Sequence, residues 1–434
     1  MNSNRSSLPK DQIDAVKLSI QQKKYDRALE LLNKISNKED NLNIVNRITA
    51  LVYLYKKDWE KSLSYFQKID NKNNFDISNN IGVALYNLGR FLEASTMFEQ
   101  AITFNNKYIP AYENLAVTQK LLGNYELSIS CILQGLKLMP NNNKIKNNLI
   151  DILNYFEPSN EENYIINIDK KLRKLESLHR KNISINNTTI SDILNKSETV
   201  LKDSNINFNF NETQIFRRNK IDLNCKRHLD IFATHKIIPK FCFSCFKVQI
   251  TLDNILDLIK LYFYFNNVNL KNNNIRKCVV ELRKNVSGNY KGYVFSDSLQ
   301  DAKEIKEILK NELQNEKINL NKIEIKRGCT EYYDEFELYK DINQNVSNII
   351  YREDWANIEK NFDEKNFTSK IKDEKVYNNT LNKFNLPDFL IIKNWLLYAK
   401  IIGDTSYKKI IKFDIDDKNF DQLQKEQIKL RKKQ

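Results

Sequence analysis

One pattern occurs four times in the first third of the chain. The four stretches begin at Lys23, Lys57, Gly89 and Gly123, which are 34, 32 and 34 residues apart. In each stretch an aromatic residue is followed three positions later by a small residue, and four positions after that by a large apolar residue. Spacings of three and four place side chains on one face of a helix. A period of this length predicts a stack of helix pairs, in which each pair packs against its neighbours.

The repeat resembles the tetratricopeptide repeat. The residues that stand where its consensus expects them are Gly82, Ala94, Ala101, Tyr112, Leu115, Gly123 and Pro140. The resemblance implies four helix pairs over about residues 9–142. The following stretch, NKIKNNLIDILNYF, places Ile145, Leu149, Ile152, Leu153 and Phe156 on one face and predicts a capping helix. We therefore expect an α-helical tetratricopeptide superhelix over residues 1–156.

Such an array presents a concave groove, and the resemblance implies which positions of each first helix line it. Those positions hold Arg47, Asn79, Asn80, Tyr86, Asn87, Glu113, Asn114 and Lys120. Asn80 and Asn114 occupy the same place in successive repeats. Because an amide side chain both donates and accepts, stacked asparagines can hold an extended peptide backbone, so we expect a protein or peptide partner. The alternative is coincidence in a chain rich in asparagine.

The rest of the chain divides into three parts. Residues 157–212 are a polar connector with two helical patterns, and residues 331–434 are an extension containing the helical pattern PDFLIIKNWLLYAKIIGD. Between them, residues 213–330 alternate strand and helix patterns in the order β-α-β-β-α-β, with Thr251 as the N-cap of the first helix. This order predicts an α+β domain with a ferredoxin-like core and the spatial strand order 4-1-3-2.

Lys291-Gly292-Tyr293-Val294-Phe295 resembles the third-strand signature of RNA-recognition domains. The match departs from that signature at Val294, and the first strand lacks the stacking aromatics. The resemblance implies a nucleic-acid face made of Lys247, Lys291, Tyr293 and Phe295. The alternative is that the last hundred residues cover this face. The net charge of +14 is weak evidence for nucleic-acid binding, because the abundant Lys, Asn and Ile suggest AT-rich codons. Only residues 215–247, with eight cations against two acids, form a local basic cluster.

Cys242 and Cys245 stand three residues apart before the first strand of the α+β domain, in the stretch PKFCFSCFKVQI. The predicted strand order brings Cys245 beside Cys329, which follows the last strand. Cys225 and His228 precede them with similar spacing. The pattern predicts a structural zinc site at Cys242 and Cys245 with two of Cys225, His228 and Cys329. One alternative is that these are buried cysteines, as we expect for Cys131 and Cys278. The other is a redox dithiol, but such a pair normally lies at a helix N-terminus, whereas this pair precedes a strand.

The remaining composition mainly excludes classes of function. No Gly-rich phosphate loop occurs, the chain has three histidines, and we assign no catalytic residue. The polar start MNSNRSSLPKDQID and the absence of a long apolar run predict a cytoplasmic chain with no membrane partner. The second half resembles a group of uncharacterised bacterial tetratricopeptide proteins in IPKFCFSCFKVQI, KRGC and WLLYAKIIGDTSYKKI. Three functions remain open: a non-enzymatic adaptor, which we prefer, an RNA-binding protein, and a protein-modifying transferase guided by the repeats.

Overall fold

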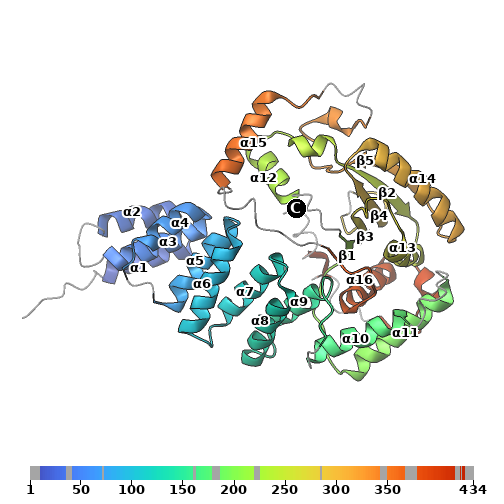
Figure 1. The fold of residues 1–434 in the computed structure, drawn as a ribbon, viewed down its shortest axis with the longest axis horizontal. Helices are drawn as coiled ribbons and strands as arrows, with labels where there is room; N and C mark the ends of the chain where they lie inside the picture. Colours follow the sequence, from blue (N-terminus) through green and yellow to red (C-terminus); the bar gives the residue numbers. More distant parts are fainter. Residues whose placement is uncertain are drawn as a thin grey trace, which may run out of the picture. The chain divides into compact units, whose positions relative to one another are not determined.

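The computed structural model describes residues 10–35, 42–70, 73–159, 163–177, 186–218, 225–283, 286–342, 349–366, 379–415, 421 and 423–425. The chain divides into two compact units (Figure 1). The first comprises Met1–Ile145 and Asp363–Val376, and the second comprises Lys146–Phe362 and Tyr377–Gln434.

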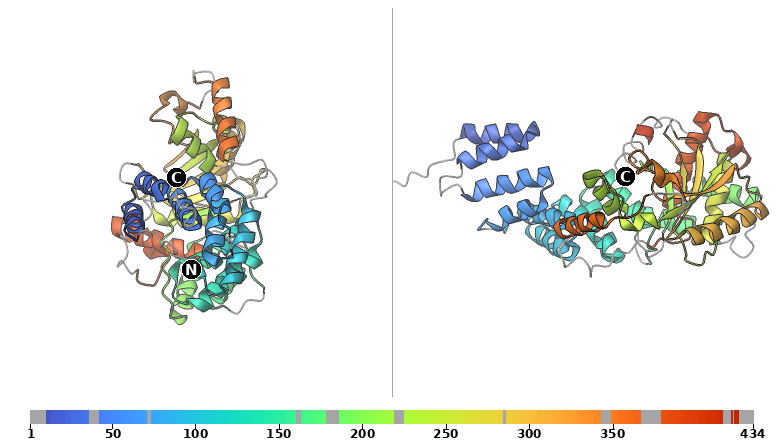
Figure 2. Two further views of the ribbon diagram at one scale, coloured as in Figure 1. Left: turned by 90° about the vertical axis from the view of Figure 1, so that its left-hand side faces the viewer. Right: turned by 90° about the horizontal axis from the view of Figure 1, so that it is seen from above.

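The first unit consists of helix pairs, and successive pairs stack side by side (Figures 1 and 2). The capping helix α9 follows the fourth pair, and its residues from Lys146 onward belong to the second unit. The helices are α1 (Lys10–Gln21), α2 (Tyr25–Ile35), α3 (Leu42–Lys56), α4 (Trp59–Gln67), α5 (Phe75–Asn87), α6 (Phe91–Phe104), α7 (Ile109–Leu121), α8 (Tyr125–Leu138) and α9 (Asn143–Ile152). The repeats predicted from the sequence are confirmed.

The small residues of the repeat are buried because they let paired helices approach closely. The four small positions are Ala28, Ser62, Ala94 and Ser128, and none is more than 1% exposed. The serine hydroxyls also bond the partner helix, since Ser62 Oγ donates to the Ala50 carbonyl at 2.9 Å and Ser128 Oγ donates to the Ala116 carbonyl at 2.6 Å. Gly82 on α5 leaves room for the Phe98 ring of α6, which would lie 2.5 Å from a Cβ atom at that position. Contact between helices therefore depends on residue size at a few repeated positions.

The second unit is built on a five-stranded antiparallel sheet with the order β1-β3-β4-β2-β5. The strands are β1 (Gln214–Arg217), β2 (Phe246–Leu252), β3 (Arg276–Val280), β4 (Tyr290–Ser296) and β5 (Lys322–Arg327). Helix α13 (Ile255–Asn267) lies between β2 and β3 in the chain, and α14 (Leu299–Asn315) lies between β4 and β5. The edge strand β1 was not predicted, because four residues are too short for a clear alternation.

Helices α13 and α14 pack against one face of this sheet (Figure 1). Gly292 of β4 makes room for Leu261 and Phe265 of α13. The prediction that Thr251 caps this helix is wrong. Thr251 belongs to β2 and pairs with Lys291, whereas the side chain of Asn254 accepts the N–H of Asp257 and caps α13. The hydrogen bonds of the sheet extend β2 past the position that looked like a cap.

Three further helices belong to the second unit: α10 (Tyr164–Ser177), α11 (Asn187–Asp203) and α16 (Leu386–Ile402). α10 packs against both α11 and α16, and α16 also packs against α13 and β1. The N-terminus of α16 is held by Asp169 of α10, whose Oδ1 accepts the Leu386 N–H at 2.8 Å. Gly403 ends α16 in the left-handed conformation, with φ 83°, as its C-cap position predicts.

A buried ion pair joins the edge strand to the helices. Arg217 of β1 lies 2.6 Å from Asp388 of α16, and their side chains are 2% and 1% exposed. The hydroxyl of Tyr262 on α13 donates to the same carboxylate at 2.7 Å. β1, α13 and α16 are therefore fixed to one another by a desolvated polar contact as well as by apolar packing.

A separate cluster of buried side chains lies beside the cysteine-containing end of the sheet. Its elements are α12 (Cys225–His235), η3 (Lys240–Phe243), η4 (Glu337–Lys340) and α15 (Glu353–Asn366). Glu359 links α15 to two other elements of the cluster. It pairs with Arg227 of α12 at 2.9 Å and accepts the backbone N–H of Lys240 of η3 at 2.8 Å. The cluster contains Ile231, Ile237, Ile238, Cys242, Tyr332, Tyr339 and Trp355.

Candidate functional sites

The positions predicted to line the groove of the repeats form polar pairs between successive first helices. Arg47 of α3 pairs with Asp76 of α5 at 2.8 Å. Asn114 of α7 donates to Oδ1 of Asn79 on α5 at 2.9 Å. Glu113, also on α7, binds the ammonium group of Lys144 on α9. These pairs connect neighbouring repeats along one side of the stack.

The two asparagines expected to form a ladder differ in their bonding. Asn79, rather than Asn80, bonds Asn114, and Asn79 is 5% exposed. Asn80 is half-buried, and its amide has no hydrogen-bond partner among the described residues. The side-chain oxygen of Asn114 likewise accepts no hydrogen bond from them. One free amide and one free acceptor thus remain on consecutive repeats.

The other groove positions give a mixed surface. Tyr86 is half-buried, and burial raises the pKa of its hydroxyl while the nearby Lys120 opposes that shift. The Tyr86 ring also meets Phe91 edge-on at 5.5 Å between ring centroids. Asn87 is exposed and donates to the Val83 carbonyl of its own helix at 2.8 Å. The surface can contact both polar backbone and an apolar side chain.

The cysteine edge, defined here as Cys242, Cys245 and Cys329, brings three thiols from two chain segments together. The N–H of Gly328 donates to the Cys245 carbonyl at 2.9 Å, which joins the start of β2 to the end of β5. Cys242 lies within hydrogen-bonding reach of Cys329, and its Sγ lies 3.3 Å from the Tyr332 hydroxyl. The Cys242 thiol lowers the pKa of Cys329, whereas burial raises the pKa of Cys245 to about 12.

The other two predicted metal ligands lie on α12. Cys225 is its exposed first residue and contributes to raising the pKa of Cys245. The ring of His228 is buried and stacks on Phe241, with 5.4 Å between ring centroids. In the described part of the chain, no three Cys, His, Asp or Glu side chains are arranged to hold a metal ion. Cys131 and Cys278 are buried at 6% and 2% exposure, as expected of packing residues.

The predicted nucleic-acid residues lie on the face of the sheet opposite α13. Gly292 faces α13, so its neighbours in β4, Lys291 and Tyr293, point to the other side. Tyr293 and Phe295 are half-buried, with 6.4 Å between their ring centroids. Lys247 lies 5.5 Å from the Tyr293 ring and donates to the Gly328 carbonyl at 2.9 Å. Lys291 is 2% exposed, so it is a buried residue of this face.

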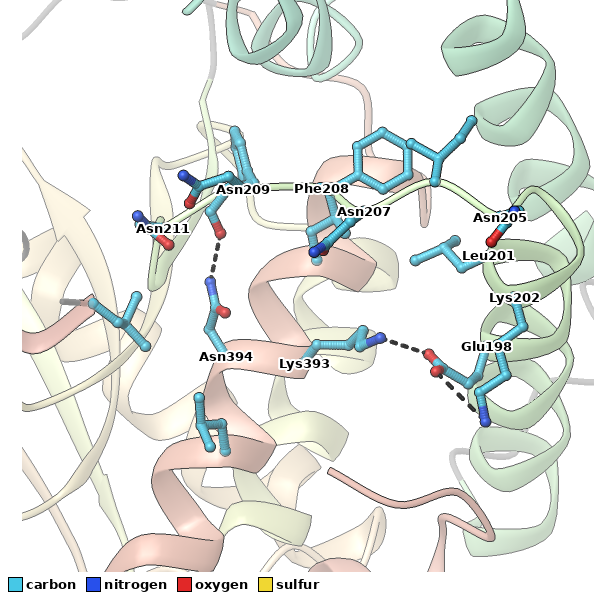
Figure 3. Close-up of a pocket in the computed structure, with 15 residues that line it drawn as sticks. Glu198, Leu201, Lys202, Asn205, Asn207, Phe208, Asn209, Asn211, Lys393 and Asn394 are labelled. Carbon is cyan, nitrogen blue, oxygen red and sulfur yellow. Dashed lines mark hydrogen bonds and ion pairs between the residues drawn. The ribbon is translucent and has the colours of Figure 1, made fainter. Parts of the chain in front are cut away.

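Sequence reasoning missed a pocket of about 460 Å³ in the second unit (Figure 3). The extended segment 205–211 and the helices α11 and α16 line it. Lys393 of α16 pairs with the largely buried carboxylate of Glu198 at 2.8 Å, and Lys202 approaches the same carboxylate at 4.0 Å (Figure 3). The pocket residues lie about 190 positions apart in the sequence, and no local pattern links them.

Asn394 of α16 holds the extended segment beside this pocket. Its amide donates to the carbonyls of Phe210 and Glu212, both at 2.8 Å. Asn147 donates to the Asn209 carbonyl at 2.9 Å, and the indole of Trp395 donates to the Thr213 carbonyl at 2.8 Å. Side-chain donors thus take the place of a neighbouring strand along this backbone.

A family model for the tetratricopeptide repeat matches residues 75–108 and 109–142. Among solved structures, a crystal structure of MamA is 14% identical, covers 32% of this chain and 81% of that chain, and has a TM-score of 0.30. MamA AMB-1 is 22% identical, covers 30% and 72%, and has a TM-score of 0.28. PilF of Pseudomonas aeruginosa is 16% identical, covers 45% and 85%, and has a TM-score of 0.33.

No curated protein matches the sequence. The family match is confined to residues 75–142, so the resemblance of the second half to bacterial proteins stays a prediction. Among the helices that the structure describes, none is long and apolar enough to cross a membrane.

Proposed function

We propose that this chain, which carries tetratricopeptide repeats, is a non-enzymatic adaptor that binds an extended protein segment in the groove of its first unit. The observation that carries the proposal is the bonding of the groove asparagines. Asn114 donates one N–H to Asn79, and among the described residues no donor reaches its side-chain oxygen and no partner binds the amide of Asn80 on the preceding repeat. A donor and an acceptor on successive repeats match the alternating groups of an extended backbone.

The second unit supplies an internal example of the same chemistry. Asn394 binds two carbonyls of an extended segment of this chain, at Phe210 and Glu212. Two such bonds from one amide show that a single asparagine can hold two residues of backbone. Tyr86 and Lys120, farther along the groove, would then contact a side chain of the bound segment.

A peptide library selected on the full chain tests this proposal. Selected peptides should bind the Asn80→Ala/Asn114→Ala double variant about ten-fold or more weakly, because two or more backbone bonds are lost. Asn267→Ala is the matched control: this exposed asparagine lies on α13 and donates only to the Phe263 carbonyl of its own helix. Peptides that bind the double variant and the wild type equally well would refute the groove assignment.

The second unit, in this proposal, is a docking domain whose β2-α13-β3-β4-α14-β5 order represents a ferredoxin-like core extended by β1. We further propose a structural zinc ion at the cysteine edge, held by Cys242 and Cys245 with two of Cys225, His228 and Cys329. The influence of Cys329 on the pKa of both Cys242 and Cys245 supports it, although the described side chains would have to move to form a metal site. His228 would have to leave its stack on Phe241 to bind, which favours Cys225 as the fourth ligand. Four protein ligands leave no position for a substrate water, so the role would be structural.

Elemental analysis of untagged protein tests the metal directly. About one zinc per chain is expected, and Cys242→Ser should lose it while Cys278→Ser keeps it, since Cys278 lies in the core of the sheet. Iron in place of zinc would indicate a cluster held by cysteines. Metal-free wild-type protein, with Cys242→Ser melting at the same temperature, would show that these cysteines only pack.

A further inference from the structure

Cations and aromatic rings alternate across four strands of the sheet in the second unit. We name Arg218, Phe216, Lys277, Tyr293 and Lys247 the cation–ring row. Arg218 lies 4.2 Å from the Phe216 ring centroid, and Lys277 lies 5.2 Å from the same ring. Lys277 is also 5.3 Å from the Tyr293 ring, and Lys247 lies 5.5 Å from that ring. Each contact is within cation–π range.

The register of the sheet places this row on one face. Phe216 of β1 pairs with Lys277 of β3, and Lys277 pairs with Tyr293 of β4. Directly paired residues share a face, and this face lies opposite the one on which Gly292 meets α13. The row residues are half-buried rather than part of the core. Lys247 stands one row further along the same face, where it pairs with Phe295 of β4 and with Lys326 of β5.

Among the described residues, Glu281 and Glu324 of this face are engaged by other cations, while the carboxylate of Glu331 acts to raise the pKa of Lys247, which burial lowers. Glu281 accepts two hydrogen bonds from Arg283, both at 2.9 Å. Glu324 pairs with Lys322 at 2.8 Å and with Lys326 at 2.9 Å. The face therefore retains an excess of positive charge beside its rings, which favours an anionic ligand that also has flat apolar surfaces.

We propose that the cation–ring row binds single-stranded nucleic acid. Bases stack on Phe216 and Tyr293, which stand two strand spacings apart, about 10 Å, so that each ring takes a separate base. Lys277, between the two rings, pairs with the phosphate that connects them, and Arg218 and Lys247 hold the flanking phosphates. An acidic protein segment would use the cations but not the two rings. This function is separate from the groove of the repeats and does not depend on it.

The test measures the fluorescence anisotropy of a labelled oligouridylate of about ten nucleotides with the full chain, at about 50 mM salt. Phe216→Leu and Tyr293→Leu keep an apolar side chain but remove the stacking ring, and each should weaken binding about ten-fold. Lys277→Gln should reduce the slope of log affinity against log salt by about 0.7. Lys303→Gln is the matched control, since it removes the same charge from an exposed position of α14.

Thermal melting of each variant separates a folding defect from a binding defect, and a variant that melts like wild type yet binds ten-fold more weakly supports the proposal. Four results would overturn it. The first is no binding at low salt, and the second is unchanged affinity in both folded leucine variants. The third is an equal loss in Lys303→Gln and Lys277→Gln, which would show only general attraction to a basic protein. Fourth, if polyglutamate displaces the RNA equally well from wild type and from the leucine variants, the face docks an acidic protein instead.

Discussion

Asparagine has several structural roles in this chain, although its abundance looks compositional. Asn74, Asn254 and Asn385 accept backbone N–H groups and cap α5, α13 and α16. Asn394 holds an extended backbone, and Asn114 joins two repeats. A short amide side chain can donate and accept close to the backbone, so this common residue supplies partners for backbone groups at several places in the fold.

At the residue scale, Gly82→Ala should destabilise the repeats by about 1–3 kcal/mol. The added methyl group would lie 2.5 Å from the Phe98 ring, which is 1% exposed and has little room to move. Gly135→Ala is the matched control, because its methyl group would come no closer than 3.1 Å to any neighbour, and that neighbour is the end of the Ile145 side chain. Chemical denaturation measures both. Equal stability of Gly82→Ala and wild type would mean that α6 can shift away from α5.

Lys291→Met should make the protein more stable at neutral pH, by an amount that shrinks as pH rises. Burial lowers the pKa of Lys291 below its ordinary value of 10.5. The folded state therefore binds this proton less well than the unfolded state, and the resulting penalty is full at neutral pH and disappears as pH approaches 10.5. The nearest carboxylate, Glu281, is 3.9 Å away and already bonded to Arg283.

Denaturation at a series of pH values between neutral and about 10.5 measures the difference between Lys291→Met and wild type. Lys303→Met, at an exposed position of α14, should show no such trend. A loss of stability in Lys291→Met at neutral pH would show that the attraction of Glu281 exceeds the cost of burying the lysine.

At the scale of elements, the extended segment before β1 is held by α16 rather than by another strand. Asn394→Ala should cost about 1–3 kcal/mol, because it leaves the carbonyls of Phe210 and Glu212 without their donor. Hydrogen exchange should speed up in residues 209–213 and in β1, which continues from them. Asn267→Ala, which removes an exposed amide on α13, should leave that exchange unchanged. Unchanged exchange in Asn394→Ala would mean that water replaces the amide at no cost.

At the scale of the whole molecule, the two compact units should unfold in separate steps. Asp388→Ala leaves the buried Arg217 without its carboxylate and should lower the stability of the second unit by about 3–5 kcal/mol. The transition of the repeats should stay in place, because their helices pack in a different unit. Calorimetry of the full chain, with Gly82→Ala as the reciprocal variant, measures this. A single transition that both variants shift equally would show one cooperative body.

The sequence alone determined the repeats, because a solenoid makes most of its contacts between neighbouring segments. The same local rule placed α13, α14 and α16, whose apolar patterns lie within each helix, although α13 is capped by Asn254 and not by Thr251. The adjacency of Cys245 and Cys329 also followed from the order of strand and helix patterns. The candidate groove residues were predicted by position and remain a prediction, whereas their pairing was not predicted, since the bond from Asn114 goes to Asn79 and not to the equivalent Asn80.

Only the tertiary structure decided how the second unit is assembled. β1 is too short to show an alternating pattern, and its partner residue Asp388 is 171 positions away from Arg217. α10 and α11 look like a polar connector in the sequence, yet α10 packs on α16 inside the second unit. The cation–ring row likewise appears only when β1, β3, β4 and β2 are placed side by side. Such contacts depend on which distant segments meet, and that choice is made by the packing of the whole unit rather than by any local period.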